Sequence, residues 1–167
     1  DPQQIVALNN LAGLYSDYLG DAKKAQESAG KARRLQPADP AIADTLGWAL
    51  FKGGDYPRAL ELLKESARKL PNEPQVQFHL GMVHYKLGDE TAAKAAFQNV
   101  VGSASQGSWR TEAEARLKIL AINPSTADAK AASELESLSA RFPDDSIILS
   151  RKAALFERDA NWSKAAA

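Results

Sequence analysis

Histidine and serine are the residue types in this chain that could support acid–base or nucleophilic chemistry, and their spacing does not favour it. His79 and His84 are five residues apart, which places them about 140° apart around a helix, so they cannot share a metal ion. Ser103, Ser105 and Ser108 lie in a Gly- and Ser-rich segment without a paired base. The absence of cysteine excludes thiol catalysis, disulfides and zinc–thiolate sites. We therefore predict that this chain is not an enzyme and binds no metal or cofactor.

Charge and hydropathy argue against nucleic-acid and membrane partners. The 21 Lys and Arg residues balance the 21 Asp and Glu residues, and no basic stretch stands ready to neutralise phosphates. No segment approaches the roughly 18 uninterrupted apolar residues that span a bilayer. The opening residues do not have the pattern of a signal peptide. We predict no nucleic-acid binding and no direct membrane insertion by this segment.

Several residues recur along the first two-thirds of the chain with a common spacing of 34 residues. The recurring residues are Gly20, Gly54 and Gly88, each followed by Asp; Ala25, Ala59 and Ala93; Leu46 and Leu80, each followed by Gly; Pro37 and Pro71; and Pro40 and Pro74. Independent positions that share one period indicate a repeated structural unit.

The recurring residues predict a helix–turn–helix unit. Leu8, Leu11, Ala12 and Tyr15 have the i, i+3, i+4, i+7 spacing of one helix face. The glycine suits the left-handed end of a first helix, and the aspartate after it can cap a second helix. The first proline of each pair stops the second helix, and the other suits the start of the next unit. Small residues such as Gly47 let the two helices approach closely.

This unit, with Leu-Gly, a ring four positions on, Gly-Asp, Ala and a closing Pro, resembles the tetratricopeptide repeat. The resemblance implies an all-α fold, a right-handed superhelical solenoid of antiparallel helix hairpins. Repeat 1 covers residues 5–39, repeat 2 covers 40–73 and repeat 3 covers 74–107. Two departures are that Leu50 and His84 occupy the usual ring position and that repeat 3 lacks its closing proline.

The repeat pattern weakens after residue 107 without ending. Residues 108–143 predict a lengthened, divergent fourth repeat, broken at Asn123-Pro124, with Ser125 as a cap for its second helix. Residues 144–167 predict a partial fifth repeat. Its first helix would turn Leu149, Ala153 and Phe156 inward.

The ends of the chain resemble repeat junctions. Ala160-Asn161-Trp162 takes the place of the Gly-Asp-Tyr turn at 54–56, Ala165 matches Ala59, and Asp1-Pro2 resembles Asp39-Pro40. We therefore expect the chain to be part of a longer array with flanking helical repeats.

The tetratricopeptide resemblance implies a concave face formed by the first helices. Residues on that face that are not needed for packing within the stack form the predicted partner-binding groove. Its aromatic rings would anchor a bound peptide. The predicted groove residues are Asn9, Asn10, Asp44, Trp48, Phe51, Lys52, Phe78, His79, Met82, Tyr85 and Lys86. The alternative is that the rings pack between neighbouring hairpins or under the C-terminal region.

Two recognition devices of the family do not fit this chain. The Lys, Asn and Arg clamp for a peptide carboxylate is missing, since Asn9 and Gly13 in the first repeat and Gln75 and His79 in the third hold the corresponding positions. Asn10 could begin an asparagine ladder along a peptide backbone. Thr45 and His79 interrupt that ladder at the next two steps.

The predicted function is a non-catalytic scaffold that binds a protein or peptide segment in the concave groove. The alternative is a structural spacer or oligomerisation array whose groove is filled by its own chain, and self-association through exposed repeat ends is a further expectation. A catalytic domain elsewhere in a longer protein is left open. The run from Leu8 to Met82 resembles repeat-rich bacterial lipoproteins that accompany exopolysaccharide and exosortase sorting systems. That resemblance implies a periplasmic envelope assembly.

Overall fold

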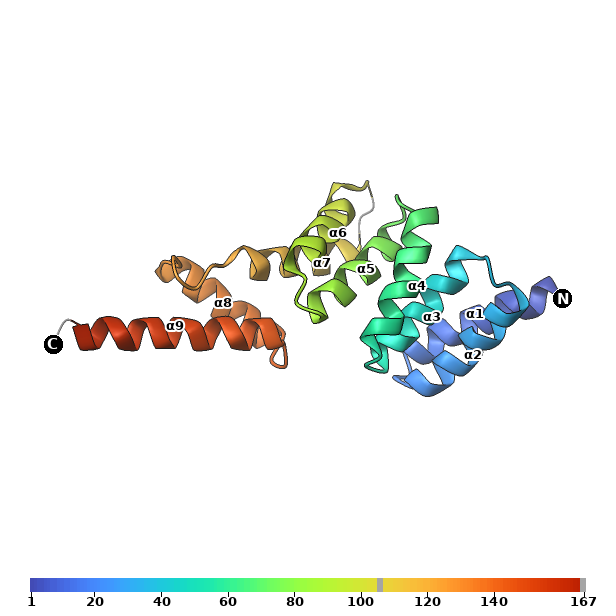
Figure 1. Ribbon diagram of the computed structural model, residues 1–167, viewed down its shortest axis with the longest axis horizontal. Coiled ribbons are helices and arrows are strands. Elements are labelled where there is room, and N and C mark those ends of the chain that lie inside the picture. Colours follow the sequence, from blue (N-terminus) through green and yellow to red (C-terminus); the bar gives the residue numbers. More distant parts are fainter. Residues whose placement is uncertain (105–106, 166–167) are drawn as a thin grey trace. The chain divides into compact units, whose positions relative to one another are not determined.

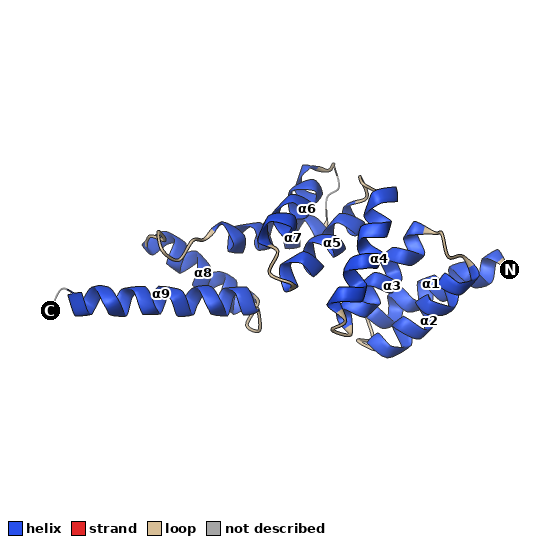
Figure 2. Cartoon of the chain, viewed as in Figure 1, coloured by secondary structure: helices blue, strands red, loops and turns tan. Residues whose placement is uncertain are grey.

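The computed structural model describes residues 1–104 and 107–165, and these residues form helices and no strands (Figures 1 and 2). The predicted all-α fold is confirmed. The helices are α1 (Pro2–Asp17), α2 (Ala22–Leu35), α3 (Pro40–Lys52), α4 (Tyr56–Lys69), α5 (Pro74–Lys86), α6 (Glu90–Gly102), α7 (Ser108–Ala121), α8 (Ala129–Arg141) and α9 (Ser146–Ala165). The chain divides into two compact units, unit 1 (residues 1–110) and unit 2 (residues 111–167).

Unit 1 contains the hairpins α1–α2, α3–α4 and α5–α6, and the predicted Gly-Asp turn joins the helices of each. Gly20, Gly54 and Gly88 have φ angles of 64°, 85° and 78°, which non-glycine residues rarely adopt. The aspartate after each glycine then caps the second helix. In the first hairpin Asp21 accepts a hydrogen bond from the Lys24 amide at 3.0 Å, and Asp55 and Asp89 do the same in the other two.

Glycine also sets the distance between the two helices of a hairpin. A Cβ atom at Gly47 would lie 2.8 Å from Cγ of Leu63, and one at Gly81 would lie 2.6 Å from Cε1 of Phe97. Leu63 and Phe97 are fully buried. Since neither backbone leaves room for a methyl group, the second helix packs directly on the main chain of the first.

Side chains of the second helices bind neighbouring hairpins. Gln26 of α2 donates a hydrogen bond to the Ala49 carbonyl of α3 at 3.1 Å. Arg33 of α2 forms a 2.6 Å ion pair with Glu65 of α4, and the hydrogen bond from Arg33 lowers the pKa of Glu65. Contacts of α2 with α3 and of α4 with α5 join the hairpins in chain order. Unit 1 is therefore a stack of helix hairpins, as predicted.

Unit 2 is held by arginines that bind backbone carbonyls and a buried carboxylate. Arg116 of α7 pairs with Asp145, which also accepts hydrogen bonds from two amides at the start of α9. Arg151 donates to the Ile122 carbonyl at 2.6 Å, and Arg158 donates to two carbonyls of the segment between α7 and α8. The cap of α8 is Asp128 rather than the predicted Ser125.

The residues predicted to face inward on α9 are wrong, because each buried apolar side chain lies one residue before a predicted one. Leu149 and Phe156 are 51% and 70% exposed and Ala153 is exposed, whereas Ile148 and Leu155 are buried. The helix also continues through residues 160–162, where a turn was expected. Ala160 replaces the glycine of the earlier turns, and a left-handed alanine is costly, so the helix does not end there. Asn161, Trp162 and Ala165 were matched to residues of the turn and helix at 54–59, and their side chains lie outside the described part of the structure.

Alanine at Gly47 or Gly81 should destabilise unit 1, because its methyl group would push the paired helices apart. We expect each of Gly47→Ala and Gly81→Ala to lower the free energy of unfolding by about 1–3 kcal/mol in urea titrations. The control is Gly13→Ala in α1, where no atom lies within 4 Å of the added Cβ. Gly13→Ala should raise stability by about 0.5–1 kcal/mol. Equal effects at the three positions would contradict the close-approach argument.

Candidate functional site

Trp48 connects three successive first helices of unit 1. Its indole Nε1 donates a hydrogen bond to Asp17 of α1 at 2.8 Å. Its ring stacks on His79 of α5, with centroids 4.1 Å apart and planes 10° apart. Its other ring contact within α3 is Phe51, stacked at 4.8 Å. One side chain of α3 thus binds both α1 and α5.

His79 continues these contacts. Nδ1 of His79 lies 3.0 Å from both carboxylate oxygens of Asp44, and both side chains are nearly fully buried. The edge of the His79 ring meets Trp109, at the start of α7, with centroids 5.3 Å apart. Trp109 also packs on Phe78 at 4.9 Å. We call Asp17, Trp48, His79, Asp44 and Trp109 the inter-hairpin ladder.

The apolar members of the predicted groove are buried. Trp48, Phe51, Phe78, Met82 and Tyr85 are each 9% exposed or less, and the polar members Asp44 and His79 are buried with them. These side chains pack between helices, which was the alternative to an open aromatic groove. The prediction could not separate the two, because a ring at such a position faces the groove or the next hairpin with the same sequence spacing.

The other predicted groove residues are accessible. Asn10, Lys52 and Lys86 are exposed, and Asn9 is half-buried. Nζ of Lys52 lies 5.0 Å above the Trp48 ring centroid. Lys52 and Lys86 hold the same position one repeat apart, at the ends of α3 and α5. The accessible members of the predicted groove therefore offer amide and ammonium groups in place of aromatic rings.

Two members of the ladder were not among the predicted groove residues. They are Asp17 of α1 and Trp109 at the start of α7. A signal was present, since Trp48, His79 and Trp109 follow one another at intervals of 31 and 30 residues. That spacing marks one ring from each successive first helix.

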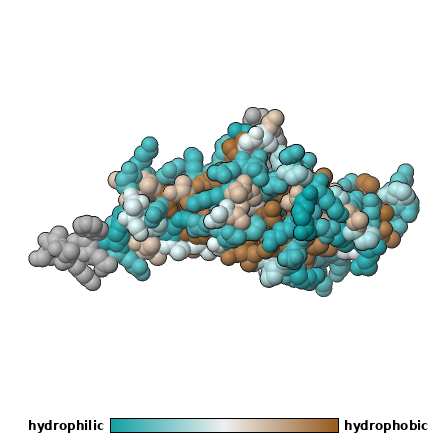
Figure 3. Space-filling view, turned by 45° about the horizontal axis from the view of Figure 1, so that its top comes forward, coloured by the Kyte–Doolittle hydropathy of each residue, from teal (hydrophilic) through white to brown (hydrophobic). Residues whose placement is uncertain are grey.

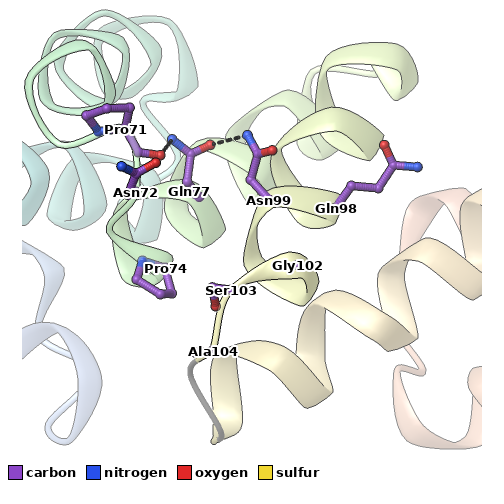
Figure 4. Close-up of a pocket in the computed structure, with 9 residues that line it drawn as sticks. All are labelled: Pro71, Asn72, Pro74, Gln77, Gln98, Asn99, Gly102, Ser103 and Ala104. Atoms are coloured by element: carbon purple, nitrogen blue, oxygen red, sulfur yellow. Dashed lines mark hydrogen bonds between the residues drawn. The ribbon is translucent and has the colours of Figure 1, made fainter.

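A hollow in unit 1 lies between the turn that precedes α5 and the end of α6 (Figure 4). Its lining includes the carboxamides of Asn72, Gln77, Gln98 and Asn99, and we call it the amide hollow. Gln77 donates to the Pro71 carbonyl at 3.0 Å and accepts from Nδ2 of Asn99 at 3.2 Å. The hollow was not predicted, because the repeat pattern marks only Pro71 and Pro74 among its lining residues and says nothing of its carboxamides.

His84 is a buried titratable group outside the ladder. Burial lowers the pKa of His84 below its ordinary value of 6.5, and the Asp89 carboxylate, 3.3 Å from Nδ1, opposes this shift. Its position is the one where the repeat usually carries a ring. His84 therefore serves as a packing side chain whose charged form is disfavoured by the fold.

Neither a metal site nor a membrane-spanning helix occurs in the part of the chain that the structure describes. Within it, no three His, Cys, Asp or Glu side chains gather where they could hold a metal ion. No described helix is long and apolar enough to cross a membrane. Figure 3 shows a largely polar face with smaller apolar areas between the polar side chains. The exposed large apolar residues include Val6, Leu14, Tyr18 and Leu19 of the first hairpin.

A family model described as tetratricopeptide repeat matches residues 10–74 and 45–108. A TPR repeat-containing protein of Pseudomonas aeruginosa is 33% identical over 81 residues, which cover 48% of this chain and 14% of that protein. The chain thus matches only a small part of this relative's length.

Solved structures share the fold. A thermophilic TPR protein from Thermus thermophilus has a TM-score of 0.63 at 21% identity, covering 93% of this chain and 84% of its own. A tetratricopeptide repeat protein from Parabacteroides merdae has a TM-score of 0.61 at 16% identity, covering 99% of this chain and 62% of its own. Identities this low support the shared fold alone.

Replacing His84 should reduce the pH dependence of stability. Because the pKa of His84 is lower in the folded state, the unfolded state binds more protons near its pKa of 6.5. The resulting loss of stability is absent well above that pH, grows as the pH falls through it and levels off below the folded pKa. We expect His84→Gln to flatten the unfolding free energy between about pH 7.5 and 5.5, measured by urea titration. Identical slopes for the two proteins would contradict this assignment.

Proposed function

The chain belongs to the tetratricopeptide repeat family, and we propose on this basis that unit 1 is a non-catalytic scaffold that binds a segment of another protein along its first helices. Proteins of this family are typically interaction scaffolds. The observation that supports the proposal here is that each first helix carries an accessible polar group, Asn10 on α1, Lys52 on α3 and Lys86 on α5. Lys52 lies over the buried ring of Trp48.

The packed rings give the surface a fixed shape. Trp48 is held by a hydrogen bond at one edge and by stacked rings on its faces, so the backbone of α3 has little freedom relative to α1 and α5. A surface that is ordered before binding pays less conformational entropy when a partner docks. The ladder therefore contributes to binding by positioning the polar groups, while its own rings stay buried.

The accessible charges favour a partner segment with carboxylates. Lys52 and Lys86 present ammonium groups one repeat apart, and the buried carboxylate of Asp44 is hydrogen-bonded to His79. Asp17, on α1, is bound to Trp48. A partner that places acidic side chains one repeat apart would pair with both lysines.

The second candidate function is a spacer whose groove is filled by its own chain. The contact of Trp109 with Phe78 and His79 supports it, because the start of α7 covers rings of the third hairpin. In that case the start of α7 would occupy part of the surface of the third hairpin. We also propose a periplasmic envelope location, which rests on the resemblance to envelope lipoproteins. Self-association is a separate proposal, which rests on the exposed repeat ends.

Charge reversal at the two lysines distinguishes the two functions. The ligands would be 12-residue peptides, selected from a random display library for binding to the whole chain. Their affinities would be measured by fluorescence anisotropy. We expect Lys52→Glu with Lys86→Glu to weaken their binding at least about tenfold, since two charged contacts become repulsive. Trp48 and Phe78 are unsuitable targets, because alanine there would damage packing as well as binding.

The matched control reverses two exposed lysines of α2, Lys23→Glu with Lys31→Glu, which changes the net charge by the same amount. Binding to this control should stay within about twofold of the unmodified chain. Equal losses in both double variants would indicate a general charge effect. Equal affinities in both would favour the spacer function.

A further inference from the structure

We propose that the amide hollow binds an extended, uncharged stretch of polypeptide through hydrogen bonds to its backbone. This would be a second binding site, formed by the turn before α5 and by the end of α6, and it goes beyond the surface along the first helices. Figure 4 shows Gln77 and Asn99 joined at one side, with Pro74 and Ser103 opposite them.

The lining of the hollow restricts the chemistry of its ligand. Among the described residues no charged side chain lines it, so a phosphate, a carboxylate or a cation would lose hydration there without a paired charge. These residues also include no aromatic ring on which a base or a sugar could stack. Its characteristic groups are carboxamides, each of which carries both a donor and an acceptor, as a peptide group does. A peptide backbone is thus the ligand whose groups match the lining.

Two hydrogen bonds fix the orientation of the central amides. Gln77 is 7% exposed. One N–H of its carboxamide donates a hydrogen bond to the Pro71 carbonyl, and its carboxamide oxygen accepts one from Asn99. Because Nδ2 of Asn99 donates a hydrogen bond to Gln77, the side-chain oxygen of Asn99 points away from Gln77 in Figure 4. The side chain of Asn99 is exposed yet already ordered. A ligand amide that donates to it therefore costs little side-chain entropy.

The remaining walls suit a backbone rather than a single large side chain. Asn72 is exposed, and its carboxamide has no hydrogen-bond partner among the residues that the structure describes. Pro74 presents a flat apolar ring and has no amide hydrogen to compete for a ligand carbonyl. Gly102 and Ala104 are small. Asn72 and Asn99 can hydrogen-bond a backbone while the prolines contact its side chains.

The test uses the whole chain, labelled with ¹⁵N, and the capped peptide acetyl-Thr-Val-Thr-Val-Thr-amide as the probe. We expect the side-chain NH₂ signals of Gln77 and Asn99 to shift as the peptide is added. The ligand control is a peptide of the same sequence with methylated backbone nitrogens. It should bind at least about fivefold more weakly, because its backbone has no N–H group to donate a hydrogen bond. Asn99→Ala should weaken binding of the unmethylated peptide by about fivefold or more.

The matched protein control is Gln36→Ala, since Gln36 carries an exposed carboxamide at the end of α2 and does not line the hollow. This variant should change the affinity by less than about twofold. The double variant Lys52→Glu with Lys86→Glu should also leave the affinity for the capped peptide unchanged. Failure of the proposed binding surface along α1, α3 and α5 would therefore not affect the test of the amide hollow. No shift at Gln77 and Asn99, or equal affinity for the two peptides, would overturn the proposal.

Discussion

The side chain of Trp48 is the contact on which the arrangement of unit 1 depends. A single helix hairpin cannot bury its apolar face alone, and repeat proteins gain most of their stability at the interfaces between repeats. Trp48 spans two such interfaces, through its hydrogen bond to Asp17 and its stacking on His79. A hydrogen bond to a charged group contributes about 1.5–3 kcal/mol and an aromatic pair about 0.5–1.5 kcal/mol. Contacts of this size are a large share of the net stability of a small domain.

The same contacts determine where a partner can bind. Aromatic rings are strong anchors only if they can enter a partner's pocket, and the rings of Trp48, Phe51 and Phe78 are buried inside the stack. Under the two proposals above, a partner would be recognised by exposed polar groups such as Lys52 and by the amide hollow. Lys52 lies over Trp48, and Gln77 is fixed by Asn99, so both surfaces are supported by ordered side chains.

The sequence predicted the hairpins because their geometry depends on local backbone chemistry. Left-handed turns at Gly20, Gly54 and Gly88 and the close approach at Gly47 admit few other residues, so they leave a periodic trace. Exposure leaves no such trace, and the burial of Trp48 and Phe78 depends on residues from other hairpins. In α9 a shift of one residue, about 100° around a helix, exchanged Leu149 for Ile148 as the inward side chain. The amide hollow combines residues from two helix ends, which a repeat period does not relate.

Native-state hydrogen exchange of the whole chain tests the coupling role of Trp48 most directly. In the unmodified chain, the central amides of α1, α3 and α5 should exchange through one cooperative opening with a common free energy. Trp48→Leu keeps an apolar side chain but removes the stacking and the hydrogen bond to Asp17. The account predicts that the α1–α2 hairpin then opens separately, at a free energy lower by about 2 kcal/mol. Unchanged protection of α1 and α2 in Trp48→Leu would contradict it.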